Sequence, residues 1–240
     1  MINKKIAESM LVEFDGCDND RPGSPESPAI WVFGIEPGDS IADKLARSKA
    51  GSKLPPSADQ SYSIERQLKW PFNQKTFKLL VAIEGETDYK AFAMRELPFV
   101  EGSEGYFKGN IYPCACNNVG EWSSETADEI GCSKEIYVQW CNEHRIPAIH
   151  TWVKKYQPKV FIGVGASYRM IFSRAVFGRE VELEEIQIPG KSQVKTIYSH
   201  IDNGCRLVVI PHFSGPYGMN CNRSIQGVGQ YIAGFIAANS

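Results

Sequence analysis

The sequence has no apolar run long enough to cross a membrane. Its most apolar stretches, such as 208–211 and 231–238, are far shorter than the roughly 20 residues that a spanning helix needs. The first residues mix lysines and glutamates with apolar side chains, without the apolar core or small-residue cleavage site of a secretory signal. We therefore expect a cytoplasmic protein with no membrane partner, and a monomer.

The sequence also lacks an excess of charge and an even number of cysteines. Its net charge of -2 gives no overall attraction for nucleic acid, so a site for a polyanion would need a local basic patch. Its seven cysteines are an odd number, and without an export signal a disulfide framework is not expected. We expect most of these cysteines to be free thiols or metal ligands.

Three common catalytic motifs are missing: the G-x-S-x-G nucleophile elbow, the phosphate-binding G-x-x-x-x-G-K loop and a dinucleotide fingerprint opening a helix. The composition, 42% hydrophobic and 22% charged, is that of a globular protein and excludes disordered, collagen-like and coiled-coil chains. No repeat and no second domain is evident. We expect a single domain over 1–240, with an N-terminal helix and loop at 1–28 and a polar insert at 40–61.

Four short apolar runs predict buried parallel strands, at 29–35, 106–112, 159–164 and 206–210. Helices are predicted between and after them, at 62–82 with a break at Pro71, 87–96 with Thr87 as cap, 133–156 with an interruption at Pro147, from 166, and 224–238. The segment 181–200 predicts a β-hairpin or a long loop. The alternation predicts an α/β fold, a three-layer α/β/α sandwich around a central four-stranded, mainly parallel sheet.

Unusual residues follow three of the predicted strands. The motifs are GIEPG at 34–38, NIYPC at 110–114 and PHFSGP at 211–216. Ligands of open α/β sheets bind beyond the carboxyl ends of the strands. We therefore expect these three motifs to converge at one edge of the sheet.

These motifs, in this order, resemble those of the uracil-DNA glycosylase superfamily. The segment 70–80 (WPFNQKTFKLL) is similar to the part of that family that bears a base-stacking aromatic residue, and 159–166 (KVFIGVGA) to its third strand and turn. The likeness covers about 29–224. It implies the fold of that family, DNA as partner, and hydrolysis of the N-glycosidic bond of a flipped uracil or modified base. The product would be the abasic site of base excision repair.

Glu36 and His212 are the candidate catalytic residues. Glycosidic cleavage produces a sugar cation and a departing base anion, so it needs negative charge on one side and a hydrogen-bond donor on the other. Glu36 occupies the position at which the family places the group that activates water, and the alternative is a helix cap, a role that suits Asp39 better. His212 would donate to the base oxygen as a neutral imidazole, and the alternative is a turn histidine bonded to backbone.

The resemblance also implies residues that hold the base and the DNA. Asn110 would contact the Watson–Crick edge and Phe72 would stack on the base, beside Ile35; alternatively Asn110 bonds backbone and Phe72 fills core. Candidates for an apolar wedge that fills the gap in the duplex are Phe213, Tyr217 and Met219. Phosphate contacts are expected from Gly38, Gly165, Ser214, Lys75, Arg169 and Arg223.

Two residues depart from the family pattern. Glu36 stands where Asp, Asn or Ala is usual, which moves the carboxylate by about one C–C bond. Phe213 stands where proline is usual. Together with the insert at 40–61, which could admit a larger base, these departures keep a bulky modified cytosine in foreign DNA as an alternative substrate. A non-catalytic binder of modified DNA or nucleotides, or a hydrolase of small nucleosides, remains an alternative function.

One branch of the family holds an iron–sulfur cluster by an N-terminal C-x-x-C and two later cysteines. Cys114 and Cys132 resemble the later pair, but upstream there is only Cys17. Residues that could complete an irregular iron or zinc site are Cys116, Cys141 and His144. Because the pattern is incomplete, we expect no cofactor and buried free thiols.

Overall fold

The computed structural model describes residues 2, 19–38, 63–114 and 122–238, and a six-stranded sheet forms its centre. The strands are β1 (Ile30–Gly34), β2 (Tyr106–Asn110), β3 (Val160–Val164), β4 (Glu184–Ile188), β5 (Lys195–Asp202) and β6 (Cys205–Ile210). Their order is β2-β1-β3-β6-β5-β4, parallel from β2 to β6 and antiparallel at β5 and β4. The predicted α/β class is confirmed, whereas the expected four strands are corrected to six.

The difference lies in the hairpin of β4 and β5, which extends the sheet beyond β6. Residues of the parallel strands are buried on both faces, as the apolar runs predicted. In β4, by contrast, only Ile188 is buried, because this strand forms the edge of the sheet. A half-exposed edge strand has no continuous apolar run, so the sequence predicted a hairpin there without joining it to the sheet.

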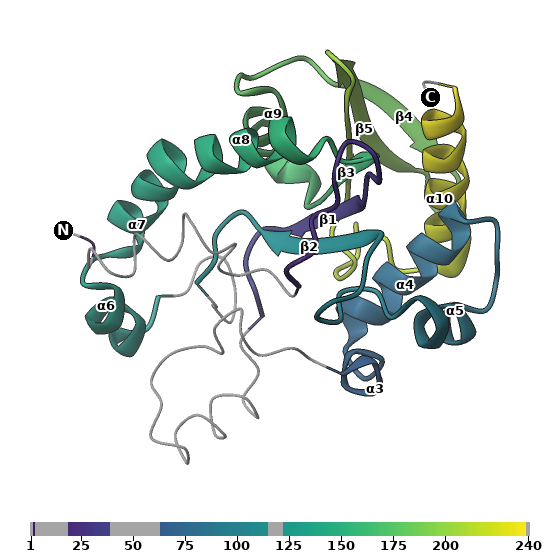
Figure 1. Ribbon diagram of the computed structural model, residues 1–240, viewed down its shortest axis with the longest axis horizontal. Helices are drawn as coiled ribbons and strands as arrows, with labels where there is room; N and C mark the ends of the chain where they lie inside the picture. The colour runs from purple at the N-terminus through teal and green to yellow at the C-terminus, as the bar shows by residue number, and fades with distance from the viewer. Residues whose placement is uncertain (1, 3–18, 39–62, 115–121, 239–240) are drawn as a thin grey trace.

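Helices cover both faces of the sheet (Figure 1). On one face lie α4 (Pro71–Ile83), α5 (Tyr89–Glu96) and α10 (Asn222–Ala237), and on the other α7 (Lys134–Trp140), a π-helical turn (Cys141–Arg145), α8 (Ile146–Tyr156) and α9 (Arg169–Phe177). Shorter helices are α3 (Ile64–Gln67), α6 (Ser124–Ile130) and a 3₁₀ turn (Ala166–Tyr168). Side chains of β1 alternate between the two cores, with Ile30 and Val32 toward α4 and Trp31 and Phe33 toward α8.

Helix boundaries follow the local chemistry. Pro71 begins α4, where its missing N–H and fixed φ fit the first turn. The cap of α5 is Asp88, whose carboxylate accepts from the N–H groups of Lys90 and Ala91, and this corrects the expected cap at Thr87. The helical run 133–156 is interrupted by the π-helical turn, not at Pro147. Of the expected N-terminal helix and loop at 1–28, residues 1 and 3–18 lie outside the described residues, as does the insert at 40–61.

The contact between α4 and α10 is unusually close. A Cβ atom on Gly229 of α10 would overlap the Cβ atom of Ala82 on α4. Because α4 carries Phe72 and Lys75, and α10 begins at Asn222, shortly after the PHFSGP segment, this contact fixes two parts of the candidate site relative to each other.

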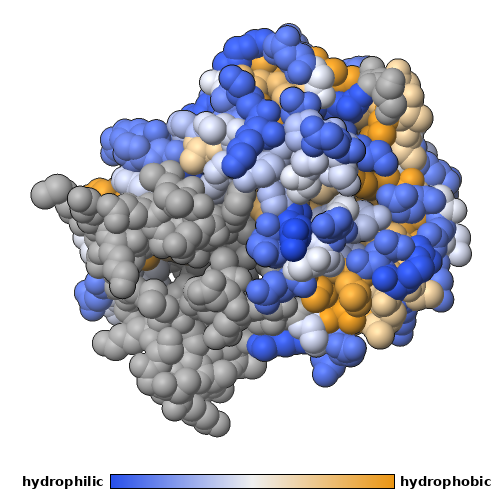
Figure 2. All heavy atoms as spheres, viewed as in Figure 1, coloured by the Kyte–Doolittle hydropathy of each residue, from blue (hydrophilic) through white to orange (hydrophobic). Residues whose placement is uncertain are grey.

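The surface visible in Figure 2 is mostly hydrophilic, with smaller hydrophobic patches between the polar side chains. Exposed large hydrophobic side chains include Met94, Val194 and Tyr217. Within the described ranges, every helix is too short or too polar to span a bilayer.

Candidate functional site

The ends of β1 and β2 bring Asn110 and Phe72 together over Gly34. Gly34 pairs with Asn110 in the sheet register. A Cβ atom at Gly34 would lie 2.6 Å from Oδ1 of Asn110 and 4.0 Å from Cζ of Phe72. Glycine at this position therefore leaves the space that the amide occupies. The next residue, Ile35, is buried, and its carbonyl accepts from the N–H of Tyr112 at 2.8 Å.

A buried arginine holds the end of β2 in place. Nη2 of Arg145 donates to the carbonyl of Asn110 at 2.9 Å, and its Nε donates to the carbonyl of Ile111 at 2.9 Å. The guanidinium also lies over the Trp152 ring, 5.6 Å from its centroid. Arg145 belongs to the π-helical turn, a feature that often occurs at functional sites. The sequence pattern did not single out this residue.

The segment after β6 carries His212 to the same region. The ring centroids of His212 and Phe72 are 6.1 Å apart, and Phe213 packs edge-on against Phe72 at 5.2 Å. Phe72 is only partly buried, so part of its ring remains open beside the histidine. Phe72 packs against the core, as one alternative from the sequence expected, and its stacking on a base stays a prediction.

The backbone determines which nitrogen of His212 carries a proton. The N–H of Ser214 points at Nδ1 at 3.2 Å, and the Ser214 hydroxyl lies 2.8 Å from the same nitrogen. Because a backbone N–H only donates, Nδ1 is an acceptor and the neutral ring carries its proton on Nε2. Burial of part of the ring, and then the charge of Lys75, lower the pKa of His212. The imidazole is therefore a neutral donor at neutral pH.

The PHFSGP segment, 211–216, is held from several directions. The ammonium of Lys75 donates to the carbonyl of Phe213, and the N–H of Met219 donates to the carbonyl of His212 at 2.9 Å. A Cβ atom on Gly218 would overlap the carbonyl oxygens of His212 and Ser214, so the chain folds back on itself here only with glycine. These contacts fix the loop that presents the imidazole.

Glu36 forms a buried ion pair that the sequence did not predict. Nζ of Lys134, at the start of α7, lies 3.1 Å from Oε1 and 3.5 Å from Oε2 of Glu36. The exposed fractions of the two side chains are 4% for Glu36 and 12% for Lys134. Burial, followed by the negative charge of Glu36, raises the pKa of Tyr168. The carboxylate therefore lies among α7, the turn after β3 and the end of β1.

Glu36 and His212 follow β1 and β6, which are separated in the sheet by β3 alone. Two strand spacings correspond to about 10 Å. Between them lies Gly165, whose positive φ of 144° and contact with Ile35 favour glycine: a Cβ atom there would lie 3.0 Å from Cγ1 of Ile35. The two strand spacings separate the two backbone segments at the carboxyl edge of the sheet.

A second buried lysine, Lys108, lies close to the Phe72 ring. Lys108, on the same face of β2 as Asn110, is 9% exposed, and its Nζ donates to Oδ1 of Asn73 at 3.0 Å. The ammonium lies 5.7 Å from the centroid of the Phe72 ring and 5.7 Å from that of Phe99. Sequence reasoning missed this residue, because a lysine inside an apolar strand gives no signal of its own.

Several residues expected to contact DNA are buried or already hydrogen-bonded within the protein. Phe213 is 2% exposed and Met219 is fully buried, so both belong to the core and the expectation that they form a wedge is corrected. Tyr217 is 81% exposed on the same loop and keeps that candidate role. The N–H of Gly165 donates to the carbonyl of Ile210 at 2.8 Å, so it is not available to a phosphate. Gly38, Ser214 and Arg223 are exposed.

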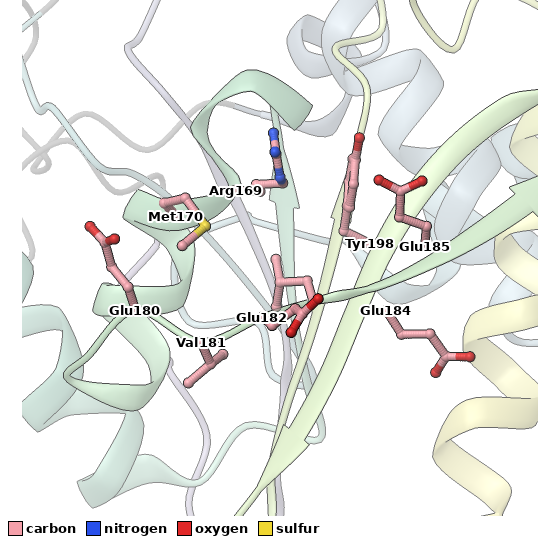
Figure 3. Close-up of a pocket in the computed structure, with 9 residues that line it drawn as sticks. Arg169, Met170, Glu180, Val181, Glu182, Glu184, Glu185 and Tyr198 are labelled. Carbon is pink, nitrogen blue, oxygen red and sulfur yellow. The ribbon is translucent and has the colours of Figure 1, made fainter.

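Arg169 lines a separate hollow that none of Glu36, Phe72, Asn110 and His212 lines. The hollow has a volume of about 640 Å³ and is lined by Arg169, Met170, Glu180, Val181, Glu182, Leu183, Glu184, Glu185 and Tyr198. The guanidinium lies over the Tyr198 ring, 4.9 Å from its centroid, and Figure 3 shows both side chains extending in the same direction. Four glutamates line the same hollow, and their negative charge would repel a phosphate. This setting does not favour the expected phosphate contact of Arg169.

The described cysteines do not assemble a metal site. Cys114, Cys132 and Cys141 are free thiols, and burial raises the pKa of Cys141 to about 12, which disfavours the thiolate that a metal requires. In the part of the chain that the structure describes, no group of three His, Cys, Asp or Glu side chains is placed to hold a metal. Cys17 and Cys116 lie outside that part.

A comparison with models of known protein families finds no match for this chain, and a search of curated proteins finds none either. The residues at the carboxyl edge of the sheet are therefore the basis for inferring a function. These residues are Glu36, Phe72, Asn110 and His212, which four separate segments of the chain contribute.

Proposed function

We propose that the protein is a DNA glycosylase that hydrolyses the N-glycosidic bond of a flipped uracil or modified base and leaves an abasic site. The observation that carries the proposal is the fixed protonation of His212. Its Nδ1 accepts from the backbone of Ser214, so Nε2–H is the free donor of the neutral ring. A neutral donor is what a base oxygen needs as it becomes negative.

Glu36 supplies the opposite charge. In the proposed reaction, water attacks C1′ of the deoxyribose while the electron pair of the C1′–N bond leaves with the base. The carboxylate of Glu36 orients the water, accepts its proton and stabilises the sugar cation that forms on the way. Lys134, at 3.1 Å, favours the ionised form of the carboxylate that this role requires.

The base is held by two further side chains. Phe72, partly open and 6.1 Å from the His212 ring, offers a surface for stacking. Asn110 carries both a donor and an acceptor and lies within reach of the same space over Gly34. Tyr217, 81% exposed on the PHFSGP side, is the residue that would fill the gap in the duplex.

The experiment uses the purified chain and duplex DNAs that carry uracil, hypoxanthine or modified cytosines, with released base measured by mass spectrometry. The variants are Glu36→Gln and His212→Gln, and Glu180→Gln is the control because this exposed carboxylate lies away from the site. We expect both site variants to lose roughly 10²–10³-fold in single-turnover rate while DNA affinity changes little. The control should match the wild type.

Three results would contradict the proposal. Binding of a modified base in DNA without release of any base would support a non-catalytic binder on the same site. Equal cleavage by the wild type and both site variants would place the reaction elsewhere. If free nucleoside competes with the DNA substrate and is itself cleaved, the protein would instead be a hydrolase of small nucleosides.

A further inference from the structure

Lys108 is a cation buried next to the aromatic ring that is proposed to stack on the base. Lys108 is 9% exposed and lies on β2, which also carries Asn110 two positions later. Burying an ammonium costs free energy unless protein groups replace its water, and an apolar side chain of similar volume is often equally stable in such a place. A lysine at this position is therefore not explained by packing.

The hydrogen bonds around Lys108 have a fixed direction that suits a cation. The carbonyl of Phe99 can only accept, so Nε2 of Gln67 donates to it at 3.3 Å, and the Gln67 oxygen is left facing Asn73. Nδ2 of Asn73 donates to that oxygen at 3.0 Å, which turns Oδ1 of Asn73 toward the ammonium. The chain of amides therefore ends in an acceptor, and position 108 requires a donor.

The same ammonium acts on the Phe72 ring. Nζ lies 5.7 Å from the ring centroid, within the range of a cation–π interaction. A base in van der Waals contact with this ring would lie no more than about 9 Å from the positive charge. At that distance, in an interior with an effective dielectric constant of ~20, the ammonium stabilises the negative charge that develops on the leaving base. This interaction changes the rate of base release by roughly tenfold.

We propose that Lys108 is a positioning residue whose charge makes the base pocket favour bases that leave as anions over bases that must be protonated to leave. This inference rests on the proposed glycosylase function. It selects uracil-type bases, which carry a ring N–H between two carbonyls, over cytosine-type bases. Lys75, whose ammonium donates to the carbonyl of Phe213, disfavours protonation of His212, so the ring that donates to the base stays neutral.

The test compares leaving groups of different acidity. Single-turnover rates are measured on duplexes carrying 5-fluorouracil, uracil and thymine, in falling order of acidity, for the wild type and for Lys108→Met. Lys90→Met is the control, since Lys90 is an exposed lysine on α5. We expect Lys108→Met to slow uracil release about tenfold, 5-fluorouracil less and thymine more, because the weakest leaving group depends most on the charge. The control should not change any rate.

Asn73→Asp is a second variant with nearly the same shape. It keeps an acceptor for the ammonium at 3.0 Å and places a negative charge beside it. We expect the same dependence on leaving-group acidity as for Lys108→Met. If Lys108→Met fails to fold, as judged by thermal unfolding, Asn73→Asp carries the test. A structural role would instead lower the three rates equally.

Equal slowing of all three bases, or no slowing, would overturn the inference while leaving the glycosylase proposal intact. If the wild type releases no base, the proposed function fails, and the charge is then tested by binding. The probe is 5-nitrouracil, an anion at neutral pH, compared with neutral uracil by calorimetry. Preference of the wild type for the anion, lost in Lys108→Met, would support the inference, and an equal preference in both proteins would overturn it.

Discussion

At His212, a backbone N–H determines the chemistry of a side chain. The contact from Ser214 to Nδ1 leaves the proton of the neutral ring on Nε2, and burial and Lys75 lower the pKa. Because the folded pKa lies below the ordinary value of 6.5, the fold favours the neutral ring. Protonation of the His212 ring therefore removes the acceptor at Nδ1 and lowers the free energy of unfolding.

A pH profile checks this assignment. We expect the rate of base release to be flat at neutral pH and to fall only below about pH 6.5, as His212 becomes protonated. The stability contributed by the neutral ring should likewise be present above that pH and lost as the pH falls through the lowered pKa. Denaturant unfolding of the wild type and His212→Gln between about pH 5 and pH 8 measures it. A difference in free energy of unfolding between the two proteins that does not change with pH would contradict this expectation.

The pair of Glu36 and Lys134 predicts a strong coupling. Lys134→Met leaves a carboxylate that is 4% exposed without the ammonium, and we expect it to lower the free energy of unfolding by about 3 kcal/mol. The double variant Glu36→Gln with Lys134→Met should be more stable than the sum of the two single changes predicts. Denaturant titration of all four proteins measures the coupling, and strict additivity would show that the pair contributes no interaction energy.

The candidate residues that could be predicted from the sequence are those that directly follow strands. Glu36, Asn110 and His212 end or follow apolar runs, and such polar residues stand out by position. Lys108, Lys134 and Arg145 could not be found this way. Their partners lie 35, 98 and 34 to 35 positions away in the chain, and pairings across such distances arise only from the tertiary fold.

At the scale of the elements, buried parallel strands and proline-bounded helices were predictable, because burial on both faces demands continuous apolar runs. The edge strand β4 and the short helix α6 were not. β4 buries only Ile188, and α6 depends on its cap, where the Ser123 hydroxyl accepts from the N–H of Thr126. Elements stabilised by one cap or one neighbour leave little pattern in the sequence.

Two glycines in α10 predict opposite effects of the same substitution. A Cβ atom at Gly229 would overlap Ala82 of α4, so we expect Gly229→Ala to cost about 1–3 kcal/mol through overpacking. Nothing lies within 4 Å of a Cβ atom at Gly234, so Gly234→Ala should be neutral or stabilise by up to about 1 kcal/mol through helix propensity. Thermal unfolding compares them, and equal effects would contradict the close α4–α10 contact.

At the scale of the whole molecule, the net charge of -2 limits how strongly DNA can be attracted. Arg223 is an exposed cation near the start of α10, and Lys75 is half-buried beside the His212 segment. With about two phosphate contacts, the plot of log affinity against log salt concentration should have a slope of roughly -2.

The measurement is a fluorescence titration of labelled duplex at several salt concentrations, with Arg223→Gln as the variant. Loss of one phosphate contact should make the slope shallower by about 1. A wild-type slope as steep as roughly -6 would contradict this expectation, because it would require a basic surface much larger than these residues provide.

The order of the strands has a consequence for how the protein becomes functional. β6 is the last strand in sequence but lies inside the sheet, between β3 and β5, and it delivers His212. While the chain is being synthesised, β1 and β2 emerge with Glu36 and Asn110 long before His212 is added. A nascent chain or a C-terminal truncation before 212 lacks the imidazole of the proposed site, so we expect the proposed base release to require the completed sheet.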